Sequence, residues 1–412
     1  MEKLEEGSSK GHLIFSLLII QLITFQYLFV EMISSYFKIV DDLILFLLIP
    51  FVFHEIILKK PIKIVLIFFY FLSGFITAYW SFSLSGILKD FLWLIKPVIL
   101  ISGAINLFNN LSKNELSLLK RILTFCVYIA IVFAFCQFIF WYLFRIELPM
   151  SGDKFVSGVE SFISEKFALR RVKSFFGHTL WLGYVCCAWL IYSVRSKKYL
   201  LSFCCSIGIL LSFSRWAAFL AMTGVFIVLF QKNKTWKIVL SILFVLVVIV
   251  LIVYMKDIIR IYNVFWGSYN TKAIKMMGIK DSFKYLKQNP FGYGFGNFGT
   301  YNSVYSFLTL KGNIDSEILS RATSGIEAMF FINLIQVGLC GSLIWLYLLV
   351  NDFMNSKNFC YCFIILIFPL IGNLYIPVFL IHLCFLSIIM KKSEKITVSR
   401  ICNEDCINKN CE

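Results

Sequence analysis

The feature that most constrains this chain is a series of apolar segments, each about as long as a membrane is thick. A helix that crosses a hydrocarbon core of roughly 30 Å needs about 17 to 25 predominantly apolar residues. About twelve windows in the sequence fit this length: 12–30, 41–57, 64–80, 91–108, 122–144, 176–194, 199–213, 215–231, 238–255, 326–350, 359–373 and 375–390. Only 15% of the residues are charged, too few for a water-soluble globule of this size. The sequence therefore predicts an all-α, polytopic integral membrane protein with a single membrane domain over 1–412.

Two apolar runs, 199–231 and 359–390, are each too long for one straight crossing. At about 1.5 Å of rise per residue, each would form a helix near 50 Å in length. Such a helix crosses the bilayer once only if it is strongly tilted. We expect the first run to divide at "SFSR" and the second at "GNLYIP".

The basic residues between the windows indicate the orientation of the chain, because short cytoplasmic loops collect Lys and Arg. With an inside N-terminus, the inside segments contain Lys59, Lys60, Lys63, Lys113, Lys120, Arg121, Arg195, Lys197, Lys198, Lys232, Lys234, Lys237, Lys391, Lys392 and Lys395. Two long loops, 145–175 and 256–325, then lie outside the cytoplasm, and 391–412 forms a cytoplasmic tail. The net charge of +16 is explained by these anchors and requires no nucleic-acid partner.

Several cations on the predicted outer side run against this rule. Arg215 interrupts the apolar run at "SFSR", and Arg170 and Arg171 precede the helix expected to begin at about 176. An arginine within hydrocarbon costs roughly 2.5 to 3.5 kcal/mol on insertion scales. These residues are therefore candidates for binding an anion, although Arg215 also has the simpler explanation of extending to the interface.

The second outer loop contains a surface helix followed by a glycine-rich stretch. Apolar residues at helical spacing over 275–287, with lysines on other faces, are typical of a helix lying on the membrane surface. Asn289 and Pro290 end that helix, and Gly292, Gly294 and Gly296 permit a tight backbone path. No strand precedes "GYGFG", so we interpret it as a loop lining an extended ligand rather than a nucleotide-binding loop.

Four segments in this order carry a family resemblance: a basic stretch leading into "SFFGHTLWLG", then "SFSRWAAFLA", "KMMGIKDSFKYLKQNPFGYGFGNF" and "IEAMFFINLIQVGLCG". Together they resemble the Wzy-type O-antigen and capsule polymerases and the related O-antigen ligases, over Arg170 to Gly341. The resemblance implies a glycosyltransferase at the outer face of the bacterial cytoplasmic membrane. Its substrate would be a glycan linked to undecaprenyl diphosphate.

The resemblance also implies roles for individual residues. Arg215, with Arg171 and Lys275, would bind the carrier diphosphate, because guanidinium groups stay charged and bind phosphate oxygens in pairs. Glu327 would be the general base for the acceptor hydroxyl. The further substrate-binding residues would be Arg170, His178, Asn289, Gly292 and Gly294. No cofactor or metal is expected; the partners would be membrane lipid and a flippase and chain-length regulator of the same pathway.

Alternatives remain for both function and residues. Ligases usually have a His where this chain has Glu327, which favours a polymerase, but Glu327 also suits the positive N-terminal end of a helix. A flippase or transporter would share this hydropathy, with charges near the bilayer midplane on discontinuous helices. Asp90 and Lys96 either pair with each other or line the glycan path, and we assign no role to His382.

Overall fold

In the computed structural model, all regular secondary structure in the part of the chain that the structure describes is helical. The structure describes residues 11–22, 24, 40–80, 84–144, 146, 148, 172, 174–176, 179–212, 214–232, 282–283, 286–296, 329–354, 359–371 and 376–392. Three helices are long and apolar enough to cross a membrane, namely Leu84–Asn109, Lys113–Phe144 and Met329–Met354. Others, such as Ile62–Ile76 and Tyr199–Ser212, are apolar but shorter. The all-α fold with membrane-type helices is confirmed, while the number of spans stays a prediction.

The helices coincide with the apolar windows of the sequence. Their bounds are α2 Val40–Lys59, α3 Ile62–Ile76, α4 Leu84–Asn109, α5 Lys113–Ile139, α6 Thr179–Arg195, α7 Tyr199–Ser212, α8 Arg215–Lys232, α14 Met329–Met354 and α15 Phe359–Ile371. An N-terminal helix covers 11–22, and a C-terminal helix covers 377–392. Window 238–255 lies outside the described residues. Both long apolar runs divide where expected, between α7 and α8 and between α15 and the C-terminal helix.

Local sequence signals set several helix boundaries. Ser112 and Glu115 form a reciprocal capping box at the start of α5, in which each side chain accepts a hydrogen bond from the other residue's backbone N–H. Pro61 precedes α3 with φ of −59°, the value its ring imposes and a helix requires. Short helical segments continue α3 as η2, Thr77–Trp80, and α5 as η3, Phe140–Phe144. These signals are local and need no tertiary contact.

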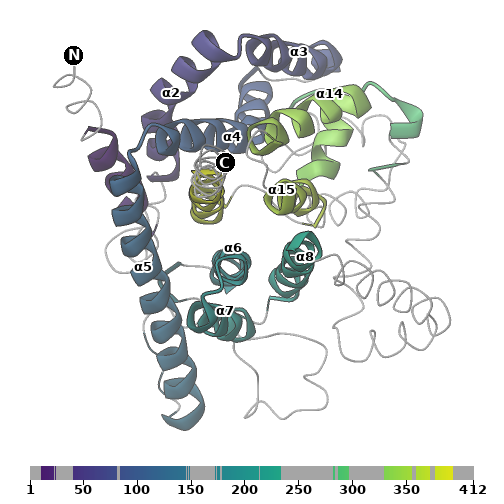
Figure 1. Cartoon of the computed structure of the whole chain (residues 1–412). Coiled ribbons are helices and arrows are strands. Elements are labelled where there is room, and N and C mark those ends of the chain that lie inside the picture. Colours follow the sequence, from purple (N-terminus) through teal and green to yellow (C-terminus); the bar gives the residue numbers. More distant parts are fainter. Residues whose placement is uncertain are drawn as a thin grey trace, which may run out of the picture.

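The helices form two groups, and α15 and the C-terminal helix lie between them (Figure 1). Helices α2, α3, α4 and α14 lie together in the upper part of Figure 1, where α2 packs on α4 and α3 packs on α14. In the lower part, α6 contacts both α7 and α8. Helix α15 contacts α8 in one group and α14 in the other, and α5 stands along one side against α7. The two groups are therefore joined through α15.

The C-terminal helix is the buried centre of this arrangement. Its Phe385 packs on Phe108 of α4 with ring centroids 5.4 Å apart, and its Phe379 lies 5.6 Å from Tyr184 of α6. Trp189 of α6 donates from Nε1 to Nδ1 of the buried His382 at 2.7 Å. His382, to which the sequence assigns no role, thus joins α6 to the C-terminal helix within the core.

Candidate functional site

The basic stretch of the first outer loop leads directly to the "SFSR" break. The backbone N–H of Val172, which follows Arg171, donates to the carbonyl of Leu211 at the end of α7, at 3.4 Å. Ser174 has a left-handed backbone with φ of 54°, which is uncommon for a residue other than glycine. Two buried hydrogen bonds to α5 hold it: its N–H donates to Gln137 Oε1 at 3.0 Å and its Oγ donates to the Ala130 carbonyl at 2.7 Å.

The "SFSR" break is a close contact between α6 and the start of α8. Ser214 caps α8, because its Oγ accepts from the Ala217 N–H at 3.2 Å. A Cβ on Gly183 of α6 would lie 2.6 Å from Ser212 Oγ and 2.9 Å from the Ala217 Cβ, so only glycine permits this approach. Arg215 is therefore the first residue of α8, at a helix N-terminus packed against α6.

Most of the predicted substrate-binding side chains lie outside the described residues. Arg170, Arg171, His178, Lys275 and Glu327 are not among the residues that the structure describes, and neither is the side chain of Arg215. Their roles stay predictions. The structure describes the backbone elements that border them: η5 (Ser174–Phe176), α8 and α14.

The stretch 289–296, which we call the glycine loop, has a turn at each end and no regular secondary structure between them. Both ends of the Asn289 side-chain amide bond to the loop's own backbone, since Nδ2 donates to the Gly292 carbonyl at 2.6 Å and Oδ1 accepts from the Phe291 N–H at 3.3 Å. Gly292 and Gly294 have φ values of 86° and 87°, a region open to glycine at little cost. Asn289 and these glycines shape the loop, and their contact with substrate stays a prediction.

The glycine loop fills a break in α14. Gly338 interrupts the helix with φ of 68° and ψ of −169°. Nearby backbone N–H and C=O groups therefore lack their usual intrahelical hydrogen-bond partners. The loop supplies new ones: Tyr293 N–H donates to the Ile335 carbonyl at 2.8 Å, and Gly294 N–H donates to the Gln336 carbonyl at 2.7 Å. The third motif thus binds the fourth motif on the residues just before Gly338.

Phe295 anchors the loop among the helices. Its side chain is fully buried, with its ring centroid 5.7 Å from those of Tyr70 and Phe91. A Cβ on Gly74 of α3 would overlap the Phe295 ring, and a Cβ on Gly294 would overlap the backbone of η2 at Ala78. The loop is therefore an integral part of the α3–α4–α14 group.

Asp90 of α4 is a buried acidic residue that binds the glycine loop. Its Oδ2 accepts from the Gly296 N–H at 2.9 Å and from Gln336 Nε2 at 2.7 Å, and the residue is 1% exposed. Lys96 instead pairs with Asp42 of α2, with Nζ 2.5 Å from Oδ1. Of the two alternatives for these residues, the Asp90–Lys96 pair is not formed, and each residue has other partners. A carboxylate in a membrane span costs roughly 2.5 to 3.5 kcal/mol on insertion scales, and these two donors offset part of that cost.

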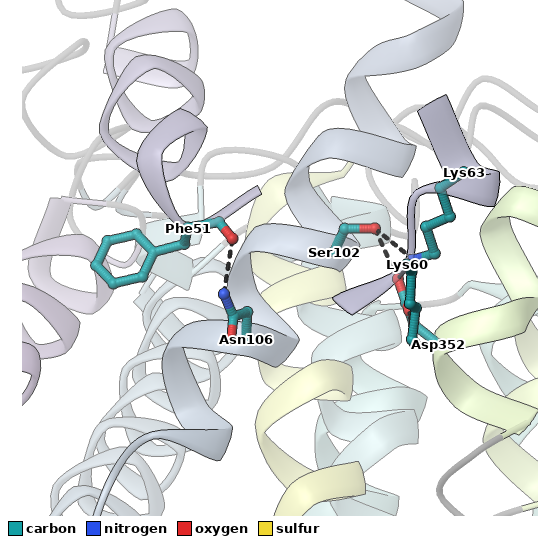
Figure 2. A network of polar contacts seen from close by, with 6 residues as sticks. All are labelled: Phe51, Lys60, Lys63, Ser102, Asn106 and Asp352. Carbon is teal, nitrogen blue, oxygen red and sulfur yellow. Dashed lines mark hydrogen bonds and ion pairs between the residues drawn. The ribbon is translucent and has the colours of Figure 1, made fainter. Parts of the chain in front are cut away.

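At the opposite end of the α3–α14 pair, lysines assigned to orientation form a buried ion-pair network (Figure 2). Lys63 is fully buried, and its Nζ lies 2.5 Å from Oδ1 of Asp352 near the end of α14. Ser102 of α4 donates to Asp352 Oδ2 at 2.6 Å, and Lys60 reaches Oδ1 at 3.0 Å. Lys63 therefore joins three helices in addition to any role in membrane orientation.

This network and the glycine loop mark opposite ends of the same helices. Lys63 begins α3 and meets Asp352 at the end of α14, whereas Tyr70 donates from its OH to Asn333 Oδ1 near the start of α14, at 2.7 Å. The two helices therefore run antiparallel. The glycine loop contacts Gly74, further still from Lys63. The loop and the lysines therefore lie at opposite ends of α3, and the side of the membrane on which each lies stays a prediction.

Among the described residues, no group of three or more His, Cys, Asp and Glu side chains could hold a metal ion. The fold and this site define an all-helical protein with membrane-type helices and a loop docked into a broken helix. No protein-family model, curated protein or solved structure shows significant similarity to this chain.

Proposed function

We propose that this protein is a membrane glycosyltransferase of the Wzy type. It would polymerise undecaprenyl-diphosphate-linked oligosaccharide repeat units into O-antigen or into a capsular or extracellular polysaccharide. In each cycle the growing chain would move from its carrier to the non-reducing end of a new lipid-linked unit, at the outer face of the bacterial cytoplasmic membrane.

The observation that carries the proposal is the pairing of the four family-like motifs. Gly183, at the end of the first motif, lies against Ser212 and Ala217 of the second motif, and the glycine loop lies against Gly338 in the fourth. These segments are distant in the sequence, and each of these pairs needs glycine at its contact. Such paired contacts are expected if the motifs build one functional region.

The reaction needs cations at the leaving diphosphate and a general base at the acceptor hydroxyl. The acceptor hydroxyl oxygen attacks the anomeric carbon, and the bond from that carbon to the carrier diphosphate breaks. The diphosphate leaves with the bonding electrons, so cations must stabilise its charge. Arg215, at the N-terminus of α8, and Arg171 before Val172 are suited to this. Glu327, two residues before α14, would take the hydroxyl proton.

A flippase is the second candidate, because the break in α14 is a feature expected of transporters. In discontinuous transporter helices, the freed backbone groups bind the ion or substrate. Here the carbonyls of Ile335 and Gln336 accept hydrogen bonds from the glycine loop, and Leu339 N–H donates to the Pro290 carbonyl at 3.2 Å. The break is filled by the protein's own chain, which favours the polymerase.

The test is a reaction of the purified protein with lipid-linked repeat units from the same cell. Protein in detergent or liposomes receives labelled units, and the products are separated by size. We expect a ladder of glycans longer than one repeat, and no ladder with heat-inactivated protein.

Two other outcomes would replace the proposal. Movement of a fluorescent lipid-linked unit across liposomes without any ladder would indicate a flippase. In a deletion strain, normal lipid-linked polymer that never reaches its final acceptor would indicate a ligase, whereas a polymerase mutant would lack all chains longer than one repeat.

A further inference from the structure

Asp90 is a buried carboxylate that the proposed reaction leaves without a role. One oxygen, Oδ2, joins three segments that are far apart in the sequence: α4, the glycine loop at Gly296 and α14 at Gln336. Both the Gly296 backbone N–H and the Gln336 side-chain amide are donors, so the residue at position 90 must supply a hydrogen-bond acceptor. A carboxylate forms shorter and stronger hydrogen bonds to such donors than a neutral acceptor does.

The contacts of Gln336 close a ring. Its backbone carbonyl accepts from Gly294 N–H at 2.7 Å, and its side chain donates to Asp90 at 2.7 Å. Asp90 in turn accepts from Gly296, two residues beyond Gly294, at 2.9 Å. A shift of the loop along α14 by one residue would break both the Gly294–Gln336 and the Gly296–Asp90 bonds. The carboxylate therefore sets the register between the loop and the first half of α14.

We propose that Asp90 is a positioning residue for glycosyl transfer, an inference that rests on the proposed function. It acts through the glycine loop, which it holds in one register on α14. Buried rings surround the place where the loop meets Asp90, because Phe295 lies 5.7 Å from both Tyr70 and Phe91 between ring centroids. Asp90 itself is 1% exposed, so its effect on the reaction passes through the loop rather than through contact with substrate.

The test compares Asp90→Ala and Asp90→Asn with a matched control, Asp42→Asn. The control removes a carboxylate whose side chain is 55% exposed and whose partner is Lys96, away from the loop. Hydrogen exchange of the peptide that covers 289–296 reports the register without any substrate. We expect exchange in Asp90→Ala to be faster by about tenfold or more, because the loop opens locally, with a smaller increase in Asp90→Asn.

The kinetic readout is kcat per folded molecule, with KM for the lipid-linked unit measured separately. We expect kcat of Asp90→Ala to fall by about tenfold or more, because displacement of a positioned group by 1 Å can cost far more than that. Asp90→Asn, which retains one acceptor oxygen, should recover part of the loss. A role confined to stability would lower the amount of folded protein and leave kcat per folded molecule unchanged.

The outcomes separate this inference from the proposed function. Unchanged exchange over 289–296 in Asp90→Ala overturns the register role, and normal kcat with faster exchange overturns the positioning role. Faster exchange in a protein whose parent makes no polymer supports the register and rejects the polymerase. If Asp90→Ala does not fold, Gln336→Leu removes one of the two donors and should change both readouts in the same direction; normal values in that variant overturn the inference.

Discussion

Removal of one partner from the Lys63–Asp352 pair should destabilise the protein more than removal of both. Asp352→Leu removes the carboxylate that binds the fully buried Lys63 ammonium, while the Ser102 hydroxyl still accepts from Lys63 Nζ at 3.2 Å. Removing one partner of a buried ion pair costs about 3–5 kcal/mol, and the remaining Ser102 contact favours the lower end.

The two single variants should differ. Lys63→Met leaves Asp352 with hydrogen bonds from Ser102 at 2.6 Å and Lys60 at 3.0 Å, so its carboxylate keeps two donors. We therefore expect Lys63→Met to lower the free energy of unfolding less than Asp352→Leu does. The double variant replaces both charges with apolar groups of similar size, a change that ranges from neutral to stabilising by about 1–4 kcal/mol.

The assay is reversible unfolding of each variant in mixed micelles, from which the free energy of unfolding is compared with that of the parent. The double-mutant cycle should give a coupling energy of at least about 3 kcal/mol between Lys63 and Asp352. If Asp352→Leu unfolds like the parent, or if the double variant is as unstable as Asp352→Leu, the buried pair does not have the energetic role argued here.

Four further predictions concern the site and the topology. Gly294→Ala should destabilise the protein by at least about 1–2 kcal/mol, from the positive φ alone, while Gly11→Ala, whose Cβ would meet open space, should unfold like the parent. Arg215→Lys should lose most polymerisation yet accumulate normally in the membrane, because Lys lacks the planar fork; full-length polymer from this variant would favour a role at the interface. Glu327→Gln should lower the initial rate about a hundredfold or more if Glu327 is the general base, and a loss under about tenfold would leave only helix stabilisation. A reporter that works only outside the cytoplasm should be active when fused within 256–325 and silent in the C-terminal tail, and activity of both fusions would refute the topology.

The positions of the helices followed from the sequence because the signal for them is local. Each helix needs only a run of apolar residues and a polar or proline break, and these are visible within about 20 residues. The divisions at "SFSR" and before Pro377 were correct for this reason. The motif order also singles out the glycine loop and the Gly338 region as functional segments, and that assignment stays a prediction.

The partners of the polar residues followed only from the tertiary structure. For Asp90 the sequence left open a pair with Lys96 on the same helix or a place on the glycan path, whereas Asp90 bonds to Gly296 and Gln336, which are 206 and 246 residues away. Lys63 was assigned to membrane orientation, and the structure buries it against Asp352, 289 residues away. Hydropathy places a residue within a helix, but which side chains meet depends on how the helices pack.

Local signals in the sequence are enough to predict apolar helices, because burial of apolar surface and intrahelical hydrogen bonding act over short stretches. The break of α14 at Gly338, and the loop some 45 residues earlier that fills it, follow from long-range packing. A broken helix is stable only if its freed carbonyls and N–H groups find donors and acceptors elsewhere. That condition is met by residues distant in the sequence, so no local pattern reveals it.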